Sequence, residues 1–217
     1  MRPVTTTAGP LASAVANNIA TSQTPSGAGA LTLNGALVVG GVAILNNPRR
    51  VLITTVSDEH TKTFTVTGTN ASGNTISETI TGPNATTGAS VLDYKTVTSI
   101  TVSAATTGAL TVGTNGVGGS PWVRFDSWAL PAIAIQCVAS GTVNYTVQQS
   151  LDDPNSATDS VTVASMTWVN HPDSNLVAAT GNVQGNYAYA PTWARVVLNS
   201  GTGSVRATFA QSGVNPA

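Results

Sequence analysis

The side chains that could do chemistry are few and lie far apart in the sequence. The two histidines are His60, in the polar turn SDEHTK, and His171, in the turn NHPDS. Neither has a second histidine, a cysteine or a carboxylate at metal-ligand spacing, so we expect no metal site. The single cysteine, Cys137, lies in the apolar run AIAIQCVA and is predicted to be a small buried residue. No histidine is spaced to activate it as a nucleophile.

The densest acidic stretch is LDDPNS at residues 151–156. Asp153 and Asn155 occupy alternate positions, as in a calcium loop, but Ala157 breaks the pattern and favours a structural turn. Glycoside hydrolysis needs two acids across a cleft, whereas the only glutamates, Glu59 and Glu78, both lie in polar hairpin segments. The sequence therefore predicts no catalytic residues, no cofactor and no enzymatic activity.

The tryptophans are the best candidates for a binding role, and all of them follow residue 121. They are Trp122, Trp128, Trp168 and Trp193. Trp122 and Trp128 share one side of a regular strand, because their spacing is even. Tryptophans that anchor a core or a subunit contact are commoner than tryptophans that stack on sugars. We therefore predict a core or interface role, with a sugar-binding platform as the alternative.

The composition is that of a neutral chain rich in hydroxyl groups. Charged residues make up 8% of the sequence and the formal net charge is −1, whereas about 25% of residues are charged in ordinary soluble domains. No basic patch is available for phosphates, so we expect no nucleic-acid binding. Weak self-repulsion favours a chain that packs against other copies or works outside the cell.

Membrane and export signals are not evident in the sequence. No run approaches the roughly 20 apolar residues of a membrane span, so we expect no membrane partner. Residues 1–20 lack the apolar core of a signal peptide, so we expect none.

The elements that must position these residues are predicted to be strands. Residues 1–29 predict an extended arm, or a helix formed only against a partner, with Leu11, Val15 and Ile19 as its apolar stripe. Residues 30–116 are rich in threonine and valine and predict an antiparallel β region with one buried face. The glycine-rich segment 115–121 marks a boundary. Residues 121–217 contain about eight short strands, which predicts an antiparallel β-sandwich or jelly roll.

The segment TFTVTGTNASGNTISETITG, residues 63–82, shows the strand pattern most clearly. Phe64 and Val66 alternate with threonine before the turn NASGN, and Ile76 and Ile80 alternate with polar residues after it. This pattern predicts a β-hairpin with a thin apolar core on one face and wet threonines on the other. Two further segments, SGTVNYTVQ at 140–148 and SGTGSVRATFAQ at 200–211, resemble each other and predict similar hairpin turns.

Four motifs follow one another after residue 120: PWVRFDSW, SGTVNYTVQQSLDDPNS, TWVNHPDS and PTWARVVLNSGTGSVRATFAQ. Their order and spacing resemble the virion structural proteins of tailed bacteriophages, in particular small head decoration, or cement, proteins. The hairpin at 63–82 is similar to a pattern common in the same class. The resemblance covers about residues 50–211 and includes no catalytic motif.

The resemblance implies a jelly-roll-like sandwich, self-association into dimers or trimers, and docking on the major capsid protein at the capsid exterior. It implies structural or interfacial roles for matching residues, which are Arg124, Asp126, Asp153, Trp168 and Arg195. We therefore predict a non-enzymatic virion protein that binds and stabilises the assembled shell. The alternatives are a tail, head-fibre or adaptor protein, or a glycan-binding adhesin module that uses Trp122 and Trp128.

Overall fold

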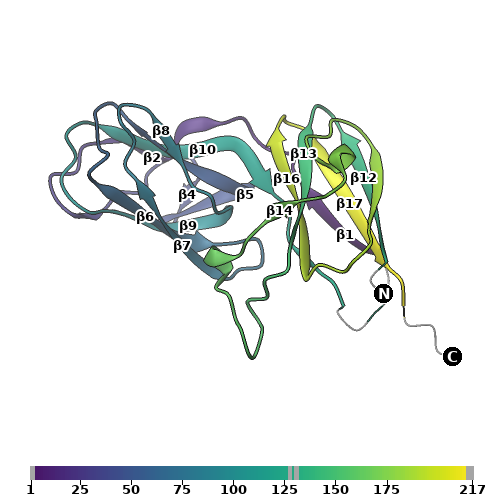
Figure 1. Cartoon of the computed structure of the whole chain (residues 1–217). Coiled ribbons are helices and arrows are strands. Elements are labelled where there is room, and N and C mark those ends of the chain that lie inside the picture. The colour runs from purple at the N-terminus through teal and green to yellow at the C-terminus, as the bar shows by residue number, and fades with distance from the viewer. Residues whose placement is uncertain (1–2, 127–128, 130–131, 214–217) are drawn as a thin grey trace. The chain divides into compact units, whose positions relative to one another are not determined.

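The computed structural model describes residues 3–126, 129 and 132–213, and antiparallel strands dominate it (Figure 1). The predicted all-β class with large antiparallel sheets, consistent with a β-sandwich, is confirmed. The chain divides into two compact units: unit 1 comprises residues 1–11 and 117–217, and unit 2 comprises residues 12–116. Within the described residues, no helix is long and apolar enough to cross a membrane.

Unit 1 is a sandwich of antiparallel sheets. The first sheet has the order β1 (Val4–Ala8), β17 (Ser204–Gln211), β12 (Ile133–Ser140) and β15 (Val183–Tyr187). The second joins β14 (Val169–Asn170), β13 (Asn144–Ser150) and β16 (Trp193–Ser200), with β11 (Val123–Arg124) paired to β16. The connections contain the 3₁₀ turns η1 (Val163–Ser165) and η2 (Ser174–Leu176).

The core of unit 1 lies between these sheets, because each strand alternates apolar side chains that point inward with polar ones that point outward. Cys137 and Phe209 enter it from the first sheet and Tyr145 from the second, and all three are fully buried. The ring of Phe125 packs edge-on against Phe209 and Tyr187, with centroid distances of 5.5 and 6.3 Å. The predicted burial of Cys137 is confirmed.

The two similar segments at 140–148 and 200–211 are corners of the sandwich rather than hairpins. The first carries the chain from β12 to β13 and the second from β16 to β17, so each crosses from one sheet to the other. Gly141 and Gly201 take positive φ angles of 75° and 99° at these bends, where a Cβ would be strained. The bends are neighbours, since the backbone N–H of Gly203 donates to the Thr142 carbonyl at 2.9 Å. The repeated sequence thus encodes two equivalent corners.

Unit 2 is a second antiparallel structure, with the strand order β10-β5-β9-β6-β7. Its strands are β2 (Val15–Gln23), β3 (Gly29–Ala30), β4 (Val38–Val39), β5 (Val42–Thr55), β6 (Thr63–Thr69), β7 (Thr75–Thr81), β8 (Thr87–Ala89), β9 (Tyr94–Val102) and β10 (Leu110–Gly119). β2 pairs with β10, β3 with β9, and β4 and β8 with β5. Residues 117–119, at the end of β10, belong to unit 1.

The hairpin predicted at residues 63–82 is confirmed, and β6 and β7 pair in register over their whole lengths. Its buried apolar side chains are Phe64, Val66, Ile76 and Ile80. On the other face, hydroxyl groups of the two strands bond across the pair at 3.1 and 3.2 Å. The Asn70 side-chain oxygen closes the turn by accepting the backbone N–H groups of Ser72 and Asn74 at 2.9 and 3.0 Å.

Within the segment 1–29, the described residues 3–29 form neither a single arm nor a helix. β1 is the edge strand of a sheet in unit 1, whereas β2 pairs with β10 in unit 2. Leu11 belongs to the core of unit 1, Ile19 is buried in unit 2, and Val15 is 41% exposed. The helical expectation is wrong, because pairing with strands that lie far away in the sequence decides the backbone of this segment.

Two segments whose alternating valines, leucines and threonines predict strands, ALTLNGALVV at 30–39 and SVTVASMTWV at 160–169, are mostly not strand. Residues 160–169 contain η1, and only Val169 of this segment pairs with a strand, as part of β14. Residues 30–39 keep only their ends as β3 and β4. Between these ends the chain turns against β2, where the N–H of Gly35 donates to the Ile19 carbonyl at 3.0 Å.

The glycine-rich segment at 115–121 contains the change of unit, between residues 116 and 117, but most of it is strand. Gly118 and Gly119 pair with Leu198 and Val197 of β16. These glycines therefore lie in β10, whose residues up to 116 belong to unit 2 and whose residues 117–119 belong to unit 1. Unit 1 is also discontinuous in sequence, since it combines residues 1–11 with residues 117–217.

Candidate functional site

Three tryptophans meet on the outer face of the second sheet of unit 1. Trp193 and Arg195 of β16 lie on the face opposite the core, because the residues between and beyond them point inward. Arg124 of β11 is the register partner of Trp193, and Trp122 precedes β11. Trp168 precedes β14. We call these five residues the tryptophan–arginine face.

The three indole rings form a contiguous cluster. The centroid of Trp122 lies 5.0 Å from that of Trp168 and 6.0 Å from that of Trp193, with interplanar angles of 59° and 67°. These separations lie in the range of favourable aromatic pairs, which is about 4.5–7 Å. All three side chains are half-buried, so each ring is held by its neighbours and still reaches the surface.

Arg195 is built into this cluster. It is 7% exposed, and its Nε and Nη2 donate to the Gln148 Oε1 at 3.0 and 2.9 Å. The guanidinium lies over the Trp168 ring, 4.2 Å from the centroid. A desolvated cation over an indole contributes about 2 kcal/mol, so this contact holds Trp168 against the sheet.

Arg124 occupies the rim of the same face. Its side chain is 54% exposed, and Nη2 lies 2.8 Å from the Asp153 Oδ2. The guanidinium also lies 5.6 Å from the centroid of Trp193. An exposed ion pair contributes only about 0–1 kcal/mol, so Arg124 orients the rim more than it stabilises the fold.

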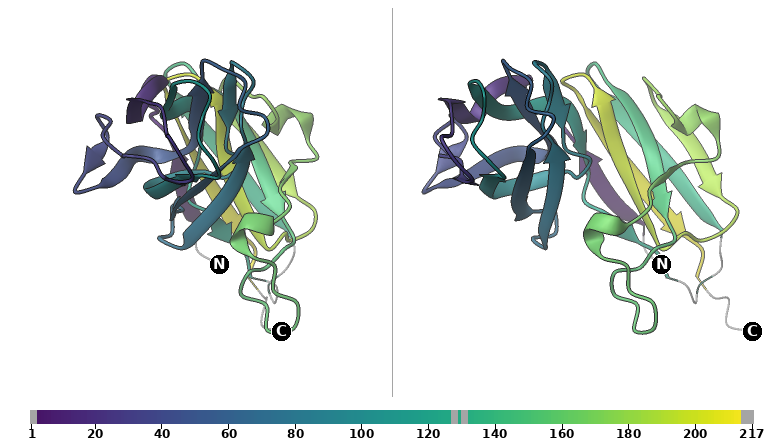
Figure 2. Two further views of the ribbon diagram at one scale, coloured as in Figure 1. Left: turned by 90° about the vertical axis from the view of Figure 1, so that its left-hand side faces the viewer. Right: turned by 60° about the vertical axis from the view of Figure 1, so that its left-hand side comes forward.

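The loop at residues 151–168 brings Trp168 to this face, and it extends beyond the ends of the strands (green in Figure 2). The Asp152 carboxylate accepts the backbone N–H of Thr167, which closes the loop next to Trp168. The adjacent Asp153 pairs with Arg124. The acidic stretch at 151–156 thus fastens a loop, as the broken calcium pattern favoured. No cluster of three or more His, Cys, Asp or Glu residues that could hold a metal occurs among the described residues.

The sequence identified the members of this face by residue type but did not group Trp122 with Trp168 and Trp193, and its pairing of Trp122 with Trp128 stays a prediction. It paired Trp122 with Trp128, and Trp128 lies outside the described residues. It missed Gln148, which holds Arg195. The signal for Gln148 is the register of β13 and β16, in which Gln148 and Arg195 are direct partners, and that register becomes known only when the sheet is known.

The glutamates fasten loops in unit 2. Glu59 is fully buried, and its Oε1 accepts the N–H groups of Thr107 and Gly108 at 2.7 and 3.0 Å. Its Oε2 lies 2.7 Å from the Lys62 Nζ. Burial by itself raises the pKa of Glu59, but the Lys62 ammonium and the two N–H groups outweigh it and hold the pKa below the ordinary value.

Glu78 has the same role at a second loop. Its carboxylate accepts the backbone N–H of Val91 at 2.7 Å and that of Leu92 at 2.9 Å. Glu78 therefore bonds to backbone donors, whereas Glu59 bonds to backbone donors through Oε1 and to Lys62 through Oε2.

The histidines have different environments. His60 is a solvated loop residue, as predicted, with a side chain 64% exposed and Nδ1 2.7 Å from the Asp58 Oδ1. His171 lies in the predicted turn but is only 3% exposed, and its ring packs on Tyr187 with centroids 4.4 Å apart. Burial lowers the pKa of His171, although the nearby Asp173 opposes the change.

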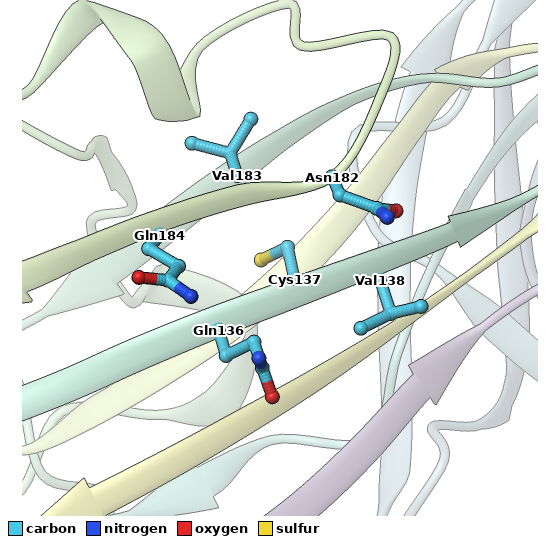
Figure 3. Close-up of a pocket in the computed structure, with 6 residues that line it drawn as sticks. All are labelled: Gln136, Cys137, Val138, Asn182, Val183 and Gln184. Atoms are coloured by element: carbon cyan, nitrogen blue, oxygen red, sulfur yellow. The ribbon is translucent and has the colours of Figure 1, made fainter.

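A shallow trough of about 370 Å³ lies over β12 and β15 (Figure 3). It is lined by Gln136, Cys137, Val138, Asn182, Val183 and Gln184. The carboxamides of Gln136 and Gln184 come from register partners, and the Asn182 Oδ1 accepts the N–H of Ala139 at 2.9 Å. Burial raises the pKa of the Cys137 thiol to about 11, so this residue is a protonated thiol at neutral pH rather than a nucleophile.

Comparison with known proteins adds no identification. No protein-family model matches the chain, and no curated protein matches it either. The tryptophan–arginine face is the strongest candidate functional site because, within the part of the chain that the structure describes, it alone combines clustered aromatic rings, cations held by neighbouring side chains and partial exposure.

Proposed function

We propose that this chain is a non-enzymatic virion structural protein that binds the assembled major-capsid shell of a tailed bacteriophage from outside and stabilises it. The observation that carries the proposal is the tryptophan–arginine face. Tryptophan and arginine are the residues that most often dominate the binding energy of protein interfaces. In this face they are clustered and held before any partner arrives.

Preorganisation favours docking on a protein surface. Gln148 and Trp168 fix Arg195, and Asp153 orients Arg124, so little side-chain freedom is left to lose on binding.

The neutral surface supports a protein that acts in many copies. Copies with a net charge near zero repel one another weakly, so dense decoration and self-association into dimers or trimers meet little electrostatic resistance. A ligand that binds only the assembled shell stabilises it by about 2.7 kcal/mol per site at a hundredfold excess over Kd. The motif order that resembles head decoration proteins supports the same assignment.

The test is the heat stability of virions that lack this protein. We expect such particles to release DNA at a lower temperature, and we expect purified protein to restore the original temperature. Trp193→Ala should restore it poorly, because it removes the centre of the face. Val39→Ala is the matched control, since Val39 is 68% exposed in unit 2 and remote in sequence from the face. Depleted particles with unchanged DNA release would contradict the proposal.

A glycan-binding module of a tail or fibre is the second candidate. The same half-buried indoles favour it, because the apolar faces of sugars stack on tryptophan rings that reach the surface. It predicts saturable binding on a glycan array that Trp122→Ala abolishes. Labelling the chain in imaged virions separates the two candidates, because decoration requires a position on the head.

A further inference from the structure

A group of polar side chains closes one side of unit 1, where the edge strands of the two sheets face each other. His171 directly follows β14, and its ring packs on Tyr187 of β15. The Tyr189 ring lies 6.1 Å from that of Tyr187, and the Tyr189 hydroxyl bonds to the Gln149 Nε2 of β13. We call these four residues the β14–β15 polar cluster.

Three polar atoms of this cluster are buried and receive no hydrogen bond from the protein. They are His171 Nε2, the Tyr187 hydroxyl oxygen and Gln149 Oε1. The residues that carry them are 3%, 1% and 8% exposed. An unpaired buried polar group costs about 1–3 kcal/mol, so three of them on side chains linked by these ring contacts and this hydrogen bond call for a partner.

The three atoms complement one another as donors and acceptors. His171 Nδ1 accepts the backbone N–H of Asp173 at 3.0 Å, so the neutral ring carries its proton on Nε2 and donates there. The Asn186 carbonyl favours the charged ring, yet it lies outside hydrogen-bond geometry with Nε2. Gln149 Oε1 accepts, and the Tyr187 hydroxyl does both. If the Gln149 amide is rotated by 180°, Oε1 bonds to the Tyr189 hydroxyl and Nε2 becomes the unpaired atom, so one atom of this amide stays unpaired in either orientation.

We propose that the β14–β15 polar cluster is an internal hydration site, in which bound water bridges His171 Nε2, the Tyr187 hydroxyl and Gln149 Oε1. A buried water typically makes about three hydrogen bonds to otherwise unsatisfied groups, and this cluster supplies a donor, an acceptor and a group that is both. The site replaces apolar packing along one side of the sandwich. It does not depend on the proposed function of the protein.

A crystal structure of the full chain, at a resolution that shows ordered solvent, tests the site directly. We expect a water oxygen within about 2.7–3.2 Å of at least two of the three atoms. A structure in which all three atoms are dry overturns the proposal.

Tyr187→Phe tests the energetics, because phenylalanine keeps the ring and its packing on His171 and removes only the hydroxyl. If the hydroxyl bonds to water, we expect the folding equilibrium constant to fall about fivefold. An unchanged or higher constant shows that the hydroxyl had no partner, and it overturns the proposal as well. Tyr145→Phe is the matched control, because the Tyr145 hydroxyl donates to the Gly181 carbonyl at 2.8 Å and its loss calibrates one buried tyrosine hydrogen bond in this unit.

Discussion

The two units stabilise antiparallel sheets with very few charges, but they do so with different side chains. Unit 2 contains Phe64 and Tyr94 as its only aromatic residues, and aliphatic side chains make up most of the rest of its core, which also encloses Arg49. The core of unit 1 contains edge-to-face rings of Phe125, Tyr187 and Phe209. Three tryptophans of unit 1 that reach the surface belong to the candidate binding face.

The loops of both units are fastened by acidic side chains, but the titratable groups buried in the two units differ. In unit 2 the buried carboxylate is that of Glu59, which accepts backbone N–H groups. Unit 1 fastens loops with the Asp152 carboxylate and with neutral groups such as the Gln211 side chain, which exchanges two hydrogen bonds with the backbone of Asp126 at 2.9 and 2.8 Å. It also requires His171 to stay neutral. Because Glu59 titrates in unit 2 and His171 in unit 1, acid should lower the free energy of unfolding of the two units in different pH ranges.

Removing a core ring should have the largest effect and tests whether each unit has its own core. Phe209→Ala should destabilise unit 1 by about 3–5 kcal/mol, because it leaves a cavity among packed rings. Denaturant unfolding followed by tryptophan fluorescence reports on this unit alone, since every tryptophan lies after residue 121. Phe64→Ala should instead act on the unfolding of unit 2 seen by circular dichroism. An equal shift of the tryptophan signal in both variants would remove the distinction between the units.

Glu59→Gln should have the next largest effect. Hydrogen bonds to a charged group contribute about 1.5–3 kcal/mol, and glutamine cannot reproduce the contact with Lys62. Because the folded pKa of Glu59 lies below its ordinary value, its stabilisation is present above about pH 4.5 and is lost as the pH falls through the folded pKa. Urea unfolding across this range should show a shallower loss in the variant. A variant with the same acid dependence as the parent chain would contradict the role of this carboxylate.

His171→Phe should have a smaller effect, confined to a higher pH range. Burial lowers the pKa of His171, so the unfolded chain takes up a proton first as the pH falls below about 6.5. Unit 1 should therefore lose stability between about pH 6.5 and the folded pKa, and the phenylalanine variant should lose less. Tryptophan-detected unfolding between pH 7 and pH 5 measures this. Equal slopes in the parent chain and the His171 variant would count against it.

Arg124→Ala should have the smallest effect, about 1 kcal/mol or less, because its ion pair with Asp153 is exposed. Arg195→Ala should lower the stability of unit 1 by more, since it removes both the stacking on Trp168 and the hydrogen bonds to Gln148. Comparing the two by tryptophan-detected unfolding sharpens the difference between the rim and the centre of the face. A larger loss for Arg124→Ala would reverse that assignment.

Local patterns in the sequence predicted the elements that depend on neighbouring residues. The hairpin at 63–82 follows from alternating residues and from Asn70, whose side chain closes its own turn. The prediction for residues 1–29 was wrong because β1 and β2 pair with β17 and β10, which come roughly a hundred residues or more later in the chain. His171 was predicted in a turn, but its burial depends on Tyr187 from another sheet.

The sequence alone determined the all-β class, the thin apolar core of the hairpin and the scarcity of groups for catalysis, because alternation and composition act residue by residue. It also singled out tryptophan and arginine as binding candidates. Only the tertiary structure decided which of them meet. Register between β11, β13 and β16 sets the partners on the outer face, and a loop fastened by Asp152 delivers Trp168 to them. Such contacts depend on the pairing of distant strands, which no local pattern encodes.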